Sequence, residues 1–584
     1  MRATDLGSTY SVDGTCSVDL VAMRSVVDIS AAENLPDRQH HPQQPTQIDW
    51  WRQAVVYQIY PRSFMDGNGD GVGDLAGITE RLPYLHRLGI DAIWFTPWYL
   101  SPFSDGGYDV SDYRQIDPRF GTLDDAEELI RQASNLGIRT IVDIVPNHVS
   151  NQHPWFQEAL ASPPGSPQRA RFWFHDGRGD QGQDMPTNWL SSFRGPTWTR
   201  TTNPDGSPGQ WYLHLFTGEQ PDLNWDNQEV RAEHQQVLRF WFDRGAAGVR
   251  VDSAALIVKD PALIDFDESQ PTPPGQHPFL DRDGIHDIYR SWRQVADTYT
   301  PPRILVGEVW LDDPARFTAY LRPDEMHTAF NFDFMTRPWD PAQLRQSIEA
   351  TLAAHAPPTW VLANHDITRP VTRYGRAETG FSFADKRHGT PTDLALGTRR
   401  ARAAFMLCAG LPGSLYIYQG DELGLPEDEE LPLDAIEDPM YFRSGGVDPG
   451  RDGCRVPLPW TEQPQHNFGF SSPRQGDSST SWLPQPSWWG RYAVQRQEED
   501  VTSMLAFYRR VVALRRDLST NGFRWLDNLP PTCLGFSRGP ISCLVNFGPT
   551  PVRAPAGQLL LTSGPTDPDM IGPDTAVWVR GEVD

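Results

Sequence analysis

Gly248-Val249-Arg250-Val251-Asp252 reads as a short buried strand that ends in one arginine and one carboxylate. Neither charged side chain contributes to the packing of an apolar strand, so this ending predicts a site at the open end of a sheet. There Arg250 would keep Asp252 ionised and oriented, as a carboxylate nucleophile requires. A structural ion pair that closes the strand is the alternative. The rest of the sequence has to decide between the two.

The sequence on either side repeats one pattern from Ala54 onward: a short apolar strand, a polar loop and an amphipathic helix. The expected strands cover residues 55–60, 92–95, 140–145, 248–251, 304–309, 329–332, 360–363 and 414–418. The expected helices lie near 75–88, 124–136, 229–244, 284–299, 313–321, 340–355, 396–409 and 501–516. This alternation predicts an α/β fold, a (β/α)8 TIM barrel, whose chemistry lies at the carboxyl ends of the strands.

Two long segments depart from this pattern. Residues 148–228 are rich in Gly, Pro, Trp and Asn and are too long for a connecting loop, so they predict a domain inserted after the third strand. The barrel is expected to comprise 49–147 and 229–516. Residues 517–584 contain short alternating runs separated by Gly and Pro, which predict a C-terminal antiparallel β-sandwich. Residues 1–48 have no regular period and predict a mobile extension.

The composition excludes several classes of partner. The chain has a formal net charge of −25, which repels nucleic acid and anionic lipid, and we expect neither as a partner. No run approaches the ~18 apolar residues of a membrane span. The cysteines are scattered and lack C-x-x-C spacing, so we expect a reducing, cytoplasmic location. A small neutral or cationic substrate fits this charge, and the sequence does not indicate an oligomeric state.

Polar residues follow four of the expected strands. They lie in the segments 143–148, 250–252, 307–310 and 364–366. Because the carboxyl ends of barrel strands meet at one rim, these side chains are expected to converge, which favours catalysis over a structural ion pair. Paired carboxyl groups suit glycoside hydrolysis, one as nucleophile and one as proton donor and then base. Asp252 fits the nucleophile, Glu308 with its apolar neighbours fits the acid, and Asp366 would stabilise the cation-like transition state.

These segments resemble glycoside hydrolase family 13, the α-amylase family, and so do residues 58–64, 220–224 and 451–455. Within it, the chain looks like the oligo-1,6-glucosidase and α-glucosidase branch. The resemblance implies a retaining exo-acting α-glucosidase acting on maltose or short oligosaccharides, in which the first sugar is held by His148, Arg250 and His365. By the same match, Asp105 and Tyr108 meet Arg455 and grip the terminal glucose, and an ion pair closes the pocket floor.

The residue after the nucleophile varies with linkage preference in similar enzymes, and here it is Ser253. Small residues accompany α-1,4 preference, whereas valine accompanies α-1,6 preference, so the resemblance favours α-1,4 links. A transglucosidase or a trehalose-synthase-like isomerase would use the same carboxylates and stays open as an alternative. Non-catalytic relatives, the heavy chains of amino-acid transporters, often lose those carboxylates, and this chain keeps them.

The segment Asp66-Gly67-Asn68-Gly69-Asp70-Gly71-Val72-Gly73-Asp74 places oxygen ligands at every second residue. This spacing suits Ca2+. It opens like an EF-hand loop, but Gly77 stands where a bidentate glutamate belongs. Similar loops in the branch bind Ca2+ through side chains matching Asp66, Asn68, Asp70 and Asp74 and the carbonyl matching Val72. The resemblance therefore implies a structural Ca2+ ion, with a metal-free turn as the alternative, and no organic cofactor.

Overall fold

The computed structural model describes residues 49–267, 269–270, 272–354, 356–473, 480–519, 522–565, 567 and 569–581. The predicted extension over residues 1–48, including Cys16, lies outside the described residues.

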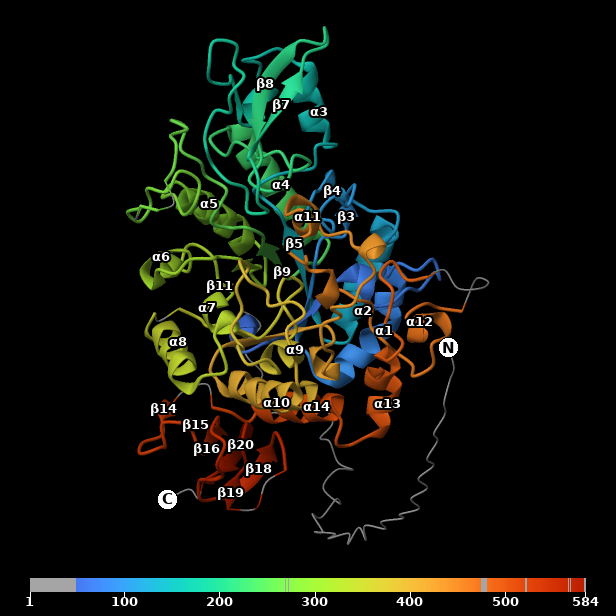
Figure 1. The fold of residues 1–584 in the computed structure, drawn as a ribbon, viewed down its shortest axis with the longest axis vertical. Helices are drawn as coiled ribbons and strands as arrows, with labels where there is room; N and C mark the ends of the chain where they lie inside the picture. The colour runs from blue at the N-terminus through green and yellow to red at the C-terminus, as the bar shows by residue number, and fades with distance from the viewer. Residues whose placement is uncertain are drawn as a thin grey trace, which may run out of the picture. The chain divides into compact units, whose positions relative to one another are not determined.

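Eight parallel strands form the central sheet (Figure 1). Its hydrogen-bonded order is β11-β10-β9-β5-β2-β1-β13-β12. The end strands β11 and β12 face each other through the hydroxyls of Thr328 and Thr359, 2.5 Å apart, which nearly closes the ring. The (β/α)8 prediction is confirmed by the strands β1 (Val55–Ile59), β2 (Ala92–Phe95), β5 (Arg139–Ile144), β9 (Gly248–Val251), β10 (Ile304–Gly307), β11 (Thr328–Ala329), β12 (Thr359–Val361) and β13 (Ser414–Tyr418).

Helices follow the strands and cover the outside of the sheet (Figure 1). Local sequence signals fix their ends: α2 begins with a capping box between Thr122 and Asp125, and α1 ends at Gly89 in the left-handed conformation with φ 91°. The helices of the barrel are α1 (Leu75–Leu88), α2 (Leu123–Asn135), α4 (Gln228–Asp243), α5 (Ile285–Asp297), α6 (Pro314–Ala319), α8 (Pro341–Ala353), α10 (Leu394–Gly410) and α14 (Met504–Arg515).

The sixth strand is shorter than expected. The predicted strand over 329–332 is instead β11, and the helix α7 (Phe332–Thr336) starts at once. Asn331 causes this early turn, because its side chain caps α7 by accepting a hydrogen bond from the backbone of Phe334.

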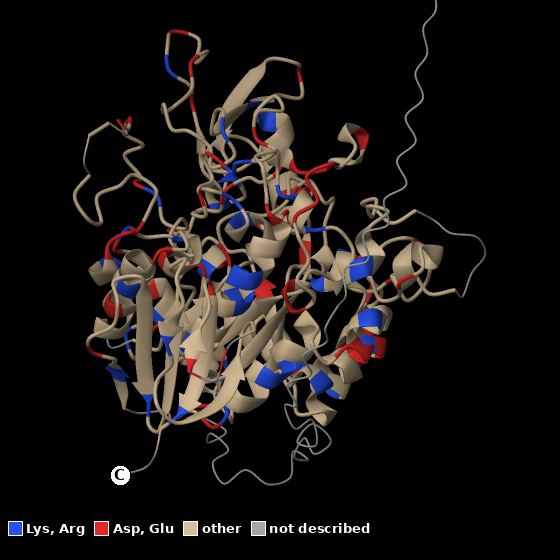
Figure 2. Ribbon diagram, turned by 60° about the horizontal axis from the view of Figure 1, so that its bottom comes forward, with Lys and Arg blue, Asp and Glu red and all other residues tan. Residues whose placement is uncertain are grey.

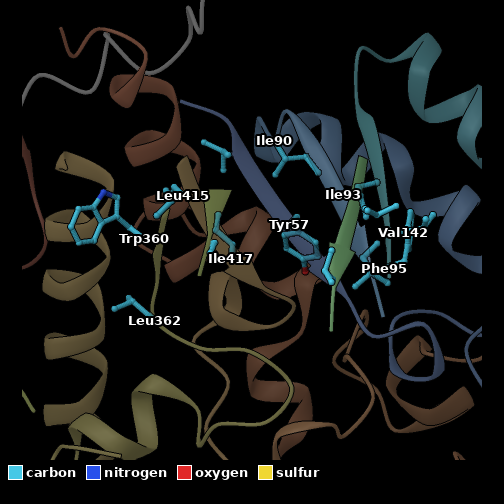
Figure 3. Packing of buried hydrophobic residues seen from close by; sticks show 14 of the residues in the cluster. Tyr57, Ile90, Ile93, Phe95, Val142, Trp360, Leu362, Leu415 and Ile417 are labelled. Atoms are coloured by element: carbon cyan, nitrogen blue, oxygen red, sulfur yellow. The ribbon is translucent and has the colours of Figure 1, made fainter. Parts of the chain in front are cut away.

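Alternate residues of the barrel strands pack into two separate layers. Tyr57, Ile93, Val142 and Ile417 belong to the large core shared with the helices, and Figure 3 shows them packed together. Their neighbours along the strands fill a smaller cluster on the other face of the sheet: Val56, Trp94, Ile141, Val306, Val361 and Tyr416. This alternation follows from the two-residue period of a strand and makes the barrel interior solid.

Gly248 begins β9 because a larger residue would not fit there. A Cβ atom at this position would lie 2.3 Å from Cγ1 of Ile304 and 2.7 Å from its carbonyl oxygen on the neighbouring strand β10. The glycine therefore lets the two strands that carry Asp252 and Glu308 approach closely.

The segment between β5 and α4 holds its own small fold. It contains α3 (Pro154–Ala161) and an antiparallel sheet of three strands, β6 (Phe174–His175), β7 (Trp198–Thr202) and β8 (Pro208–Leu213). A bridge between His148 and Asp222 joins the two ends of the segment where it leaves and re-enters the barrel. The strands β3 (Tyr99–Leu100) and β4 (Asp112–Ile116) form a hairpin after β2.

The C-terminal part consists of antiparallel strands. A five-stranded sheet contains β14 (Phe523–Trp525), β15 (Cys533–Arg538), β16 (Ile541–Asn546), β18 (Gln558–Thr562) and β20 (Thr575–Arg580). A two-stranded sheet of β17 (Val552–Arg553) and β19 (Met570–Ile571) packs on one face through Leu544, Ile571 and Val577. The close approach of Gly410 to Phe536 and Trp578 shows that α10 covers the other face.

Lys and Arg are interspersed with Asp and Glu over the helices and loops in Figure 2. Within the described part of the chain, no helix is long and apolar enough to cross a membrane. Cys408, Cys454, Cys533 and Cys543 are buried free thiols.

Candidate active site

Arg250 lies at the centre of the carboxylates that follow the barrel strands. Its Nη1 donates to Asp252 at 2.6 Å and to both carboxylate oxygens of Asp143 at 3.0 Å. Its Nη2 donates to Glu308 at 2.5 Å. These contacts arise because β5, β9 and β10 are neighbouring parallel strands, with Asp143 directly beside Arg250. The predicted contact between Arg250 and Asp252 is present, and Asp143 and Glu308 share the same guanidinium.

Glu308 is surrounded by hydrogen-bond donors rather than by apolar side chains. Besides Arg250, the backbone N–H of Ser253 donates to Oε2 at 2.9 Å and Trp310 Nε1 donates to Oε1 at 3.0 Å. The apolar setting expected from its sequence neighbours is therefore wrong, because Trp310 turns its N–H toward the carboxylate. Both carboxyl oxygens of Glu308 are held in place by the protein.

Ser253 adopts a left-handed backbone conformation, with φ 44°, directly after Asp252. This conformation is strained for a residue other than glycine, and such strain is concentrated at functional sites. The turn directs the N–H of Ser253 to the Glu308 carboxylate and the N–H of Ala254 to the Glu308 carbonyl at 3.0 Å. The loop after β9 thus ties the two carboxyl groups of the proposed chemistry together.

Burial governs protonation in this cluster. It raises the pKa of Asp252 well above the usual range, against the opposing charge of Arg250 and with a further increase from Glu308. It also raises the pKa of Asp143 to about 7, again against Arg250. Burial therefore opposes the expectation that Arg250 keeps Asp252 ionised, although the guanidinium still favours the charged form through its own charge and the 2.6 Å hydrogen bond.

The pKa of Asp366 shifts in the opposite direction. Burial on its own would raise the pKa of Asp366, but His365, Arg451 and Arg455 hold it well below the usual range. The guanidinium nitrogens of Arg451 and Arg455 lie 3.0 and 3.2 Å from Oδ1. Asp366 is therefore ionised at neutral pH, as stabilisation of positive charge on a sugar requires.

His365 is fixed from two sides. The amide nitrogen of Gln58 lies 2.7 Å from Nδ1, and Nε2 faces Asp366 at 3.5 Å. The ring of Tyr108 stacks on the imidazole with a centroid separation of 5.3 Å, and its hydroxyl lies 3.3 Å from Asp143. Burial lowers the pKa of His365 to about 3, so the ring is a neutral hydrogen-bonding group.

Asp105 is paired with Arg451 rather than with Arg455. Arg451 Nη2 donates to Asp105 Oδ1 at 2.7 Å, and the two side chains are 7% and 6% exposed. Arg455 instead contacts Asp366 and the carbonyl of His365. The predicted Asp105–Arg455 pair is therefore wrong: both guanidinium groups reach Asp366 Oδ1, but Asp438 holds Arg451 so that its Nη2 also reaches Asp105. An ion pair closes this side of the site, but it uses the earlier arginine.

Two residues that the sequence reasoning did not single out support this ion pair. Asp438 accepts hydrogen bonds from the backbone N–H, Nε and Nη2 of Arg451 at 2.6, 2.7 and 3.0 Å. The amide nitrogen of Gln220, from the inserted segment, lies 3.1 Å from Asp105 and 3.0 Å from His148. Gln220 belongs to the segment 220–224 that carries the resemblance, although no role was predicted for it, whereas Asp438 has no neighbouring motif.

Lys259 is a third residue of the site for which the sequence reasoning predicted no role. Its ammonium group is completely buried and lies 2.8 Å from Asp222 and 2.6 Å from the side-chain oxygen of Asn147. It therefore joins the loop after β9 to both ends of the inserted segment. Burial and the charge of Lys259 lower the pKa of His148 to about 3, so this histidine is neutral as well. A lysine that ends the apolar run 254–258 was the signal in the sequence.

A cavity of about 600 Å³ adjoins the site at Asp366 and Arg451. Its other walls come from the segments 383–390, 427–436 and 441–454. The cavity is of a size that holds small molecules.

The glycine-rich loop at 66–74 fits a hard cation in its residue types and burial. Asp66 and Asp74 are 0% and 3% exposed, and in the described part of the chain neither forms an ion pair with Lys or Arg. Burial raises the pKa of Asp74 to about 6, although backbone N–H groups oppose this and Asp66 adds to it. A cation would compensate these two charges. Asn68 and Asp70 are exposed beside them, and Val72 lies between Asp70 and Asp74.

The loop side chains now bond to their own backbone. Asp66 accepts from the N–H groups of Gly69 and Gly71 at 2.6 and 2.8 Å, and Asp74 accepts from that of Gly77 at 2.6 Å. In the ranges that the structure describes, no three His, Cys, Asp or Glu side chains converge as a metal site. The oxygen donors of the loop, and the burial of two carboxylates that have backbone N–H groups but no Lys or Arg as partners in the described residues, are thus the two observations that favour a metal.

Comparison with known proteins agrees with this geometry. The family described as "Alpha amylase, catalytic domain" matches residues 58–521. A probable alpha-glucosidase of Rhizobium meliloti (strain 1021) is 36% identical over 490 residues, which are 80% of this chain and 83% of the relative. An oligo-1,6-glucosidase of Parageobacillus thermoglucosidasius is 33% identical over 506 residues, 80% of this chain and 84% of the relative.

A solved structure is similar over almost the whole chain. The alpha-glucosyl transfer enzyme XgtA has a TM-score of 0.78 and 32% identity, with 92% of this chain and 100% of that chain covered. With the barrel and the carboxylates at its strand ends, these matches show that the chain is a glycoside hydrolase and belongs to family 13, the α-amylase family, in its oligo-1,6-glucosidase and α-glucosidase branch.

Proposed function

We propose that the enzyme is a retaining exo-acting α-glucosidase that hydrolyses terminal α-linked glucose from short oligosaccharides. One observation carries the exo-acting part: the buried pair of Asp105 and Arg451, 2.7 Å apart, borders the site beside Asp366. A site closed at this end admits the last sugar of a chain and no sugar before it. Asp105, Tyr108, His148 and His365 would hold that glucose.

The proposed reaction has two steps. A carboxylate oxygen of Asp252 attacks the anomeric carbon while the bond to the leaving oxygen breaks, and Glu308 gives its proton to that oxygen. Glu308 then takes a proton from water, whose oxygen attacks the anomeric carbon and releases the Asp252 carboxylate. Asp366 stabilises the positive charge in both transition states. Arg250 donates to both Asp252 and Glu308, which fixes the two carboxyl groups beside each other as this mechanism requires.

The product's configuration tests the mechanism. NMR of the first product from maltose is expected to show α-glucose before mutarotation, and β-glucose appearing first would overturn the role of Asp252. The variant Asp252→Asn is expected to lose turnover by about 10³-fold or more while its thermal unfolding stays close to that of the wild type. A variant that kept activity would exclude a covalent glucosyl–Asp252 intermediate.

Transfer to a sugar hydroxyl is the second candidate. The similarity to an alpha-glucosyl transfer enzyme favours it, since the same two carboxyl groups serve when an acceptor hydroxyl replaces water. Product analysis at high maltose concentration separates the candidates: free glucose alone supports hydrolysis, whereas trehalose or longer oligosaccharides support transfer.

We also propose that Ca2+ binds the loop at 66–74, through Asp66, Asn68, Asp70 and Asp74 and the carbonyl of Val72. The ion would neutralise the two buried carboxylates and fix the loop between β1 and α1. It would take no part in bond cleavage.

A further inference from the structure

A turn of the inserted segment packs against the arginine of the buried ion pair. The ring of Phe193 lies beneath the guanidinium of Arg451, with 4.9 Å between the ring centroid and Cζ. Both residues are 7% exposed, and the ring of Phe216 meets Phe193 edge to face with 5.2 Å between the centroids. A cation held against an aromatic face is favourable where water is excluded. Phe193 therefore covers the ion pair of Arg451 with Asp105.

The turn that carries Phe193 is strained. It covers residues 191–195, and its ends are joined by a hydrogen bond from the N–H of Ser191 to the carbonyl of Gly195 at 3.0 Å. Arg194 and Gly195 have φ of 67° and 78°. A left-handed conformation is unfavourable for a residue such as Arg194 and persists only where the surroundings hold it. The turn therefore needs support from outside itself.

Arg443, the last residue of the short helix α11 (Pro439–Arg443), supplies this support. Its Nε and Nη2 donate to the carbonyl of Arg194 at 3.0 and 2.6 Å. Nε also donates to the carbonyl of Phe193 at 3.3 Å, and Nη2 donates to that of Pro196 at 3.2 Å. A planar guanidinium can bind several carbonyls at once, whereas the ammonium group of a lysine lacks this fixed geometry.

One short segment thus holds both partners of the contact. Asp438 is the N-cap of α11 and accepts hydrogen bonds from Arg451. At the other end of the helix, Arg443 holds the turn that presents Phe193. Figure 1 shows α11 beside the inserted segment, between that segment and the barrel. The distance between Phe193 and Arg451 is therefore set from both ends of α11.

We propose that Arg443 is a positioning residue that acts through Phe193: it keeps the ring on Arg451 and so keeps water away from the Asp105–Arg451 pair. The inference rests on the proposed α-glucosidase function, in which this pair closes the glucose site. An ion pair is stronger in a dry, weakly polarisable setting than in contact with water. Without Arg443 the turn relaxes, water reaches the guanidinium, and the closed end of the site binds glucose less tightly.

The test is a mutant cycle of Arg443→Met and Phe193→Leu, read as kcat/KM for methyl α-glucoside and as the inhibition constant of glucose. Each single variant is expected to lower kcat/KM and to raise the inhibition constant about tenfold, and the double variant by about the same factor. Arg443→Lys keeps the charge without the planar group and is expected to show most of the loss.

A second cycle separates positioning from a merely structural role. In Asp105→Asn the ion pair is already broken, so adding Arg443→Met is expected to change kcat/KM by less than about twofold. A residue that only stabilised the fold would lower activity in this background as well. If Arg443→Met folds poorly, Phe193→Leu replaces it in this cycle, because leucine keeps an apolar side chain at the position.

Arg200 offers a matched control. It also binds carbonyls through its guanidinium, those of Gly209 and Gln181 at 3.1 and 2.9 Å, but all three residues belong to the inserted segment. Arg200→Met is expected to leave kcat/KM and the inhibition constant unchanged. Equal losses in Arg200→Met and Arg443→Met would show general loosening of the inserted segment and would overturn the proposal.

The remaining outcomes distinguish this proposal from the proposed function. Failure of the wild type to cleave both methyl α-glucoside and maltose would refute the α-glucosidase function itself. An active wild type whose kinetics were unchanged by Arg443→Met would overturn only the role of Arg443. Additive losses in the cycle of Arg443 with Phe193 would overturn it too, because the two residues would then act separately.

Discussion

A double-mutant cycle on Asp105 and Arg451 tests which arginine closes the proposed glucose site. The perturbations are Asp105→Asn, Arg451→Gln and the two combined, with Arg455→Gln in a parallel cycle. Asp105 and Arg451 are 2.7 Å apart and almost fully buried, whereas Arg455 contacts Asp366 and not Asp105. Only the first pair is expected to act as a unit.

The magnitude follows from the geometry. Two unit charges about 4 Å apart attract by about 4 kcal/mol at an effective dielectric of about 20, and desolvation cancels part of this. A hydrogen bond to a charged group contributes about 1.5–3 kcal/mol. Each single change in the first pair is therefore expected to lower kcat/KM about a hundredfold, and the double variant about as much. The coupling energy would be about 2 kcal/mol or more.

The assay is kcat/KM for methyl α-glucoside together with the inhibition constant of glucose, which reports the same site directly. The losses from Asp105→Asn and Arg455→Gln are expected to add within about 0.5 kcal/mol. Additive losses for Arg451 and strong coupling for Arg455 would refute the reasoning and restore the sequence prediction. Circular dichroism of each variant shows whether the fold is kept, since Arg451→Gln also leaves Asp438 without its partner.

Three other predictions concern charge, metal and linkage. The charge of Asp143 raises the pKa of Asp252, so Asp143→Asn is expected to move the acid limb of the kcat/KM profile to lower pH; a limb shifted upward would contradict this. Folding raises the pKa of Asp74 from 3.8 to about 6, so the free energy of unfolding of the metal-free protein falls as the pH rises through this window. A chelator is therefore expected to lower Tm at pH about 7.5 but hardly at pH about 5. An unchanged Tm at both pH values argues against calcium. With the small residue Ser253 after the proposed nucleophile Asp252, kcat/KM is expected to be higher for maltose than for isomaltose; a clear isomaltose preference would contradict the proposed α-1,4 preference.

The fold was predictable because it depends on short-range patterns. Apolar runs of four to six residues, each followed by an amphipathic helix, gave strand positions that agree with β2, β9 and β13. The miss at β11 has a local cause, since the cap formed by Asn331 competes with strand extension and wins where the strand is short. The strand and helix propensities of these residues do not show whether the strand extends or the helix starts.

The site residues were predictable only where they directly follow barrel strands. Asp252, Glu308 and Asp366 follow barrel strands, and parallel pairing brings them to one rim without further information. Arg451 reaches Asp105 from a loop whose direction depends on Asp438. No sequence spacing encodes that direction, so the resemblance pointed to Arg455 instead.

The reach of Arg451 also bears on how the enzyme folds. Its guanidinium joins Asp105 and Asp366, which are 346 and 85 positions away along the chain. Loop closure over such separations is slow and comes late. During refolding, helix content is therefore expected to return before activity does. The recovery of catalysis would report the formation of the contacts of Arg451 with Asp105 and Asp366.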